Sequence, residues 1–79
     1  MSGVGVNGVE RSVLNKLFRG YHLAVDPDGR FRYYDEHDEP EWTESRRVVD
    51  RLRWKGLITN DGRLSERGRS LISAAQRYR

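Results

Sequence analysis

The chain has 79 residues, the size of one small domain, and contains no cysteine. Disulfide bonds and thiolate metal sites are therefore excluded, and a reducing compartment is expected. No apolar run approaches the length of a membrane span, and the first residues lack the apolar core of a signal peptide, so we expect a cytoplasmic protein with no membrane partner.

The net charge of +3 is unevenly distributed along the chain. Residues 26–44 hold most of the acids, whereas residues 45–79 hold most of the arginines. Such asymmetry indicates either a surface that binds a polyanion or head-to-tail self-association.

A first helix is predicted after a flexible start at residues 1–7. Asn7 and Glu10 have the spacing of a capping box. The apolar positions then follow a helical period, which places one set of side chains on the inner face: Val9, Val13, Leu14, Leu17 and Phe18. Gly20 is expected to end the helix.

Alternating apolar residues predict a β-hairpin over residues 21–35, with its turn at Asp26-Pro27-Asp28-Gly29. Residues 35–41, DEHDEPE, are predicted to be an acidic connector, too charged for the core. His37 lies among these carboxylates, but the spacing matches no metal-ligand pattern, so a solvated loop is favoured and no metal or cofactor is predicted.

A second helix is predicted over residues 43–55, capped by Thr43. Helical geometry places Val48, Val49 and Leu52 on its inner side and basic residues on the other. A β-hairpin over residues 57–64 follows, turning at Asn60-Asp61-Gly62. Ser65 then caps a third helix with inner residues Leu71, Ile72, Ala75 and Tyr78, and Gly68 permits close packing.

The basic helix and the second hairpin carry the candidate nucleic-acid-binding residues. Arginine suits this function because it pairs with phosphate oxygens and reads guanine in the major groove. The candidates are Arg46, Arg47, Arg51, Trp54, Lys55 and Arg63. Trp54 is open to two interpretations, since the first hairpin could cover it or a ligand could contact it. Trp42, next to the start of this helix, is expected to be a core or a seam residue.

The segment RVVDRLRWKGLITNDGRLSERGRSLI resembles winged helix-turn-helix proteins of bacteria and their phages, including the multiple-antibiotic-resistance and PadR-like families. The resemblance covers about residues 43–79 and implies an α+β winged-helix-like domain, residues 1–79. The predicted order is helix, hairpin, helix, hairpin (the wing), helix. It also implies a small DNA-binding or transcription-associated protein that contacts double-stranded DNA, as a monomer or homodimer, in a bacterium or a phage-infected host.

A protein-interaction function is the alternative. The acidic surface over residues 26–44 would then bind a protein partner, as in a phage-encoded interaction module or an inhibitor of a host enzyme. Its candidate residues are Asp35, Glu36, Asp38, Glu39 and Glu41. RNA binding through the aromatic residues is a third hypothesis. Catalysis is not expected, because the chain has two histidines, no cysteine and no phosphate-binding glycine motif.

Overall fold

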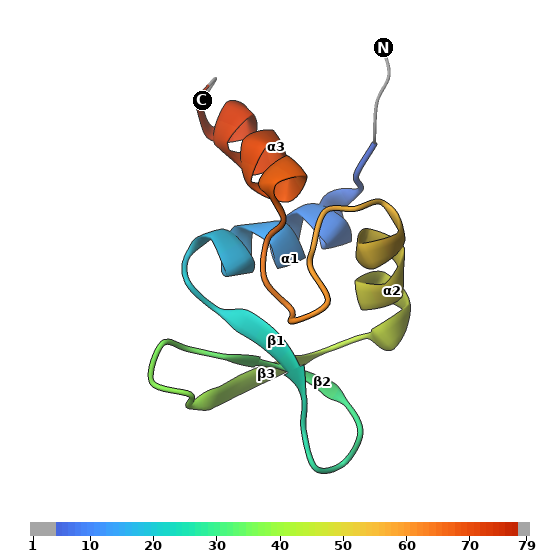
Figure 1. The fold of residues 1–79 in the computed structure, drawn as a ribbon, viewed down its shortest axis with the longest axis vertical. Coiled ribbons are helices and arrows are strands. Elements are labelled where there is room, and N and C mark those ends of the chain that lie inside the picture. The colour runs from blue at the N-terminus through green and yellow to red at the C-terminus, as the bar shows by residue number, and fades with distance from the viewer. Residues whose placement is uncertain (1–4, 78–79) are drawn as a thin grey trace.

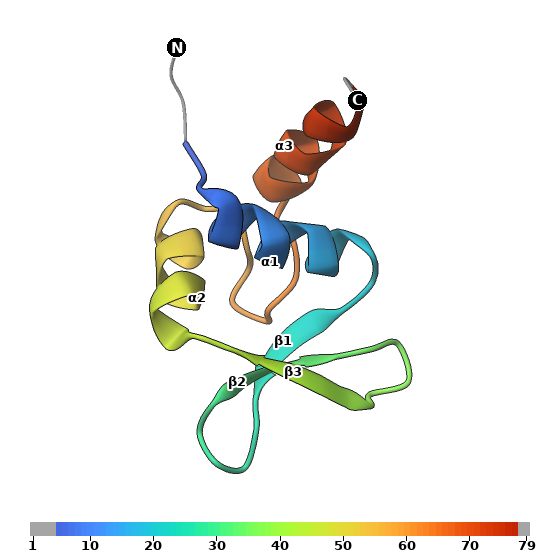
Figure 2. The same cartoon turned by 180° about the vertical axis from the view of Figure 1, so that it is seen from behind.

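The computed structural model describes residues 5–77, with side chains through Ala74, and they form an α+β fold. The element order is α1 (Gly8–Phe18), β1 (His22–Val25), β2 (Phe31–Tyr34), β3 (Pro40–Glu44), α2 (Arg46–Trp54) and α3 (Glu66–Arg77). The strands form one antiparallel sheet in the order β1-β2-β3. Helix α1 lies between the sheet and α3 (Figures 1 and 2).

The predicted capping box of α1 is confirmed. The Asn7 side chain accepts a hydrogen bond from the Glu10 backbone at 2.8 Å, and the Glu10 carboxylate accepts one from the Asn7 backbone at 3.1 Å. Val13, Leu14 and Leu17 enter the core as expected. Val9 does not: it is exposed, and its neighbour Glu10 is the residue of the first turn that is buried against α2.

The first hairpin is also confirmed, with Leu23 opposite Tyr33 and Val25 opposite Phe31. Its turn is fixed by the buried carboxylate of Asp26, which accepts hydrogen bonds from the backbones of Asp28 and Arg30, each at 2.9 Å. The larger apolar side chains of the hairpin belong to the core shared with the helices.

The acidic connector contains a third strand that the sequence did not predict. Residues Pro40–Glu44 pair with β2, placing Glu44 opposite Phe31. Because β3 is an edge strand, it tolerates a proline and charged side chains that a central strand would not. Arg32 fastens it by donating to the Glu41 carbonyl at 2.8 Å, and the buried Tyr33 hydroxyl donates to Glu44 at 2.7 Å.

The predicted start of the second helix at Thr43 is therefore wrong. Thr43 pairs with Arg32 inside β3, and the helix begins at Arg46 with Ser45 as its N-cap. Ser45 makes no side-chain capping bond; its own backbone N–H donates to Glu44 at 3.1 Å. Thr43 therefore belongs to a strand paired with β2 and does not cap the helix, although its local sequence is typical of an N-cap.

The second hairpin is reduced to a single bridge between Ile58 and Leu64. Its turn at residues 60–62 forms as predicted, but the loop does not project as a wing. The Gly62 carbonyl accepts a hydrogen bond from the Leu23 backbone at 2.9 Å, so the loop covers the free edge of β1. The apolar residues at the two ends of this loop, Leu57, Ile58 and Leu64, are buried in the core.

Helix α3 starts as predicted, because the Ser65 hydroxyl accepts a hydrogen bond from the Gly68 backbone at 3.0 Å. Gly68 permits close packing, since a Cβ there would lie 2.1 Å from the Leu57 carbonyl oxygen. Ile72 is buried and Leu71 packs beside the core, whereas the Ala75 side chain and Tyr78 lie outside the described residues. Across residues 5–77, no helix is long and apolar enough to cross a membrane.

Candidate nucleic-acid interface on helix α2

Helix α2 separates its apolar and charged residues as predicted. Val49 and Leu52 are fully buried, and Val48 packs beside them. The opposite side exposes Arg47, Asp50, Arg51 and Trp54, the set called here the α2 face. Arg47 and Arg51 are one turn apart, so their charges lie along one line that ends near Trp54.

Trp54 lies in solvent, with 88% of its surface exposed. The interpretation that the first hairpin covers it is wrong. The sheet lies at the N-terminal end of α2, whereas Trp54 belongs to the last turn at the other end (Figure 1). Tryptophan is among the residue types most enriched at the energetically dominant positions of interfaces, which makes Trp54 a candidate contact residue.

Arg46 and Arg53 lie over the buried ring of Phe31, with guanidinium carbons 5.4 and 5.3 Å from its centroid. Arg53 also donates to the Asn60 carbonyl at 3.2 Å, which ties α2 to the loop after it. Its Nε is buried without a hydrogen-bond partner among the described residues. The exposed Arg46 borders the α2 face, whereas Arg53 stabilises the packing of α2 against the loop and Phe31.

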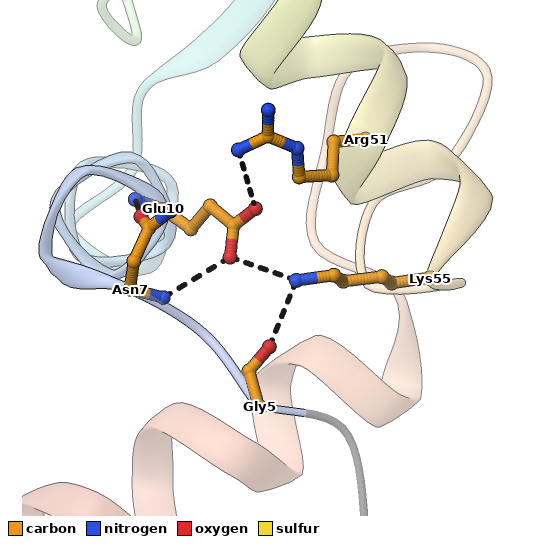
Figure 3. A network of polar contacts seen from close by, with 5 residues as sticks. All are labelled: Gly5, Asn7, Glu10, Arg51 and Lys55. Carbon is orange, nitrogen blue, oxygen red and sulfur yellow. Dashed lines mark hydrogen bonds and ion pairs between the residues drawn. The ribbon is translucent and has the colours of Figure 1, made fainter.

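The other flank of α2 is fastened to α1 by Glu10, a carboxylate only 1% exposed (Figure 3). Lys55 Nζ donates to Glu10 at 2.9 Å, and Arg51 Nη1 contacts it at 3.4 Å. Lys55 also donates to the Gly5 carbonyl at 2.8 Å, which holds the segment before α1. Two of the six predicted nucleic-acid-binding residues, Arg51 and Lys55, are therefore held by Glu10.

The sequence did not predict this contact, because the capping box already accounted for Glu10. The signal that could have found it is the surplus of cations on α2 next to a carboxylate at the apolar face of α1. Burial by itself would raise the pKa of Glu10, but the bonds from Lys55, Asn7 and Arg51 outweigh burial and hold the pKa below its ordinary value.

Arg63 lies on the loop that Arg53 holds against α2. Its side chain is exposed while Leu64 points into the core, as predicted. The loop is stiffened by a hydrogen bond from the Thr59 hydroxyl to Asp61, which holds the pKa of Asp61 below its usual range. Arg63 is therefore presented by a docked loop.

The turn between β2 and β3 lies on the opposite side of the molecule from α2 (Figures 1 and 2). The turn between β2 and β3, residues 35–39, is called here the acidic turn. Asp35 closes it by accepting hydrogen bonds from the backbones of His37 and Glu39 at 2.8 and 2.9 Å. Glu36, Asp38 and Glu39 are exposed, and Glu41 follows in β3.

A metal site at His37 gains no support. Within the described part of the chain, no group of three or more histidine, cysteine, aspartate or glutamate side chains could hold a metal ion.

No protein-family model matches the chain, and neither a curated protein nor a solved structure matches it.

Proposed function

We propose that this protein binds double-stranded DNA through the α2 face, as a small winged-helix-like regulator. The observation that supports the proposal is the composition of that face. Arg47 and Trp54 point into solvent, and Arg46, Arg51 and Lys55 border them, against the single acid Asp50. A cationic helix with one exposed aromatic residue is suited to the major groove and its flanking phosphates.

Three residues of the α2 face have distinct roles in this proposal. Arg47 has no partner among the described residues and is available to phosphate or guanine. Arg51 is held by Glu10 through one nitrogen, and a guanidinium has further N–H groups, so it can bind a phosphate in a fixed orientation. Asp50 repels phosphate but can accept a hydrogen bond from the amino group of cytosine, which would give the face some sequence preference.

The docked loop changes how Arg63 would act. A projecting wing reaches along the DNA, whereas this loop lies against β1 and α2. Arg63 is therefore proposed as a phosphate contact beside the helix, without entry into the minor groove.

Titration against random-sequence duplex DNA at several salt concentrations tests the proposal. The logarithm of the association constant should fall with the logarithm of salt, with a slope of about −0.9 per phosphate neutralised. Arg47→Ala should make the slope shallower by about 1. Arg19→Ala is the matched control, because Arg19 is exposed at the end of α1 on the other side of the molecule. Absence of duplex binding at low salt would refute the proposal.

A protein-binding function is favoured by a separate observation. Asp35 and the exposed Glu36 of the acidic turn line a hollow that also contains the half-exposed Trp42. Charge next to an accessible aromatic surface is typical of protein interfaces. Capture of a partner by the wild-type protein that is lost on Glu36→Gln with Glu39→Gln, together with no duplex DNA binding by the wild-type protein at low salt, would favour this function over DNA binding.

A further inference from the structure

The hollow beside the acidic turn has a volume of about 400 Å³, within the range of ligand-binding pockets. Trp42 lies in it and is 52% exposed, so the expectation of a core position is wrong. Its indole packs edge-on against Tyr21 and Tyr33, with ring centroids 5.5 and 6.3 Å away. The hollow therefore has an aromatic floor that remains half open to solvent. It is called here the Trp42 hollow.

The two walls of this hollow carry opposite charges. One wall is the acidic turn, where the Glu36 side chain is 81% exposed. The other wall is the end of α1, with Lys16 and Arg19. Lys16 is occupied, since its ammonium lies 5.7 Å from the Trp42 ring centroid and donates to Ser12 at 3.0 Å. Arg19 is the exposed cation of that wall.

The α2 face carries the complementary arrangement. Trp54 is an exposed apolar group of the size that aromatic hollows accept. At about 100° per residue, Asp50 lies to one side of Trp54 and Arg47 and Arg51 to the other. Asp50 beside Trp54 thus has the opposite charge to Arg19 beside the hollow. Arg47 and Arg51 likewise have the opposite charge to the carboxylates of the acidic turn.

We propose that the protein self-associates head to tail, with Trp54 of one copy entering the Trp42 hollow of the next. Arg47 and Arg51 then face the acidic turn, and Asp50 faces Arg19. The occupant is a second copy of this chain because both complementary surfaces lie on it. Helix α2 lies on the opposite side of the molecule from the turn between β2 and β3 and the end of α1 (Figures 1 and 2), so the contact is heterologous and continues into a ring or an open chain.

The contact covers the α2 face, so self-association and DNA binding exclude each other, although neither depends on the other. One tryptophan and a few exposed ion pairs make a small interface, and we expect a Kd between about 10 μM and 1 mM. The affinity should fall as salt is raised, because the flanking charges are exposed.

Sedimentation velocity over a concentration series, through about 1 mM, tests the proposal. The wild-type protein should form species larger than a dimer. Trp54→Ala removes the inserted group. In the double variant, Glu36→Lys inverts the exposed carboxylate that lines the hollow, and Glu39→Lys inverts a second exposed charge of the acidic turn outside that lining. Both changes are at exposed side chains, and thermal melts check that each variant is folded. Each variant alone should remain monomeric.

Mixing the two variants gives the decisive result. The Trp54→Ala protein keeps an intact hollow and the double variant keeps Trp54, so an equimolar mixture should form a dimer that grows no further. A wild-type protein that stays monomeric would overturn the proposal. So would association that persists in Trp54→Ala, or wild-type association that stops at a dimer, which would indicate a symmetric interface.

Discussion

Gly29 and Gly62 have nearly the same backbone conformation, with φ angles of 83° and 80°. Both follow turn signals in the sequence, and both avoid the steric cost that a side chain has in the left-handed region. Their surroundings differ. A Cβ on Gly29 would meet nothing within 4 Å, whereas one on Gly62 would lie 1.9 Å from the Leu23 carbonyl oxygen. Of these two glycines, only Gly62 lies in contact with the backbone of β1.

This difference gives a matched pair of substitutions. Gly29→Ala should cost about 1–2 kcal/mol, the penalty of the left-handed conformation alone. Gly62→Ala should cost about 2–5 kcal/mol, because the loop must also move away from β1. Chemical denaturation of both variants measures the two free energies. Equal losses would mean that the loop is not docked on β1.

At the scale of elements, helix α2 shows which features local sequence can predict. Its buried side was predicted correctly, since the spacing of Val49 and Leu52 follows from helical geometry alone. Its start was not, because Thr43 pairs with Arg32 of the preceding strand, a contact that lies outside the local capping pattern. The contact of Glu10 with Lys55 was missed for the same reason, since it spans 45 residues.

Substitutions on the two sides of α2 should separate fold from surface. Leu52→Ala should destabilise the protein by about 2–5 kcal/mol, because it leaves a cavity in the core. Trp54→Ala should change the stability by less than about 0.5 kcal/mol, because its indole lies in solvent. Thermal melts measure both effects. A large loss for Trp54→Ala would indicate that the indole packs against the protein in solution.

The link between α1 and α2 should make stability depend on pH. Glu10→Gln keeps a side-chain oxygen for the Asn7 backbone but removes the charge that holds Lys55 and Arg51. At neutral pH we expect a loss of about 1.5–3 kcal/mol, the contribution of hydrogen bonds to a charged group. Glu36→Gln is the control at an exposed carboxylate.

The sign of the pH effect follows from the lowered pKa of Glu10. Its contribution is fully present above the ordinary value of 4.5 and is lost as pH falls through the lower folded pKa. The stability difference between wild type and Glu10→Gln should therefore shrink in acid, as the wild-type carboxylate becomes neutral. Urea titrations at neutral and acidic pH measure it. A difference that stays constant down to strong acid would show that the carboxylate charge does not join the helices.

At the scale of the whole molecule, the separation of charge seen in the sequence is retained in space. The acidic turn and the α2 face lie on opposite sides, along a direction in which the molecule is 23 Å wide (Figure 1). The sequence alone could not predict this separation, because the acidic residues directly precede the basic helix. Strand β3 creates it by carrying the chain along the edge of the sheet from the acidic turn to α2.

This separation predicts how the acidic turn affects DNA binding. At about 0.15 M salt the Debye length is about 8 Å, so Glu36→Gln with Glu39→Gln should leave DNA affinity unchanged. At about 0.01 M salt it is about 30 Å, and removing the two charges should tighten binding about twofold. Asp50→Asn is the control on the α2 face and should tighten binding at both salt concentrations. Affinities are measured by fluorescence anisotropy with duplex DNA. Equal tightening by the acidic-turn variant at both salt concentrations would place the DNA near that turn and refute α2 as the interface.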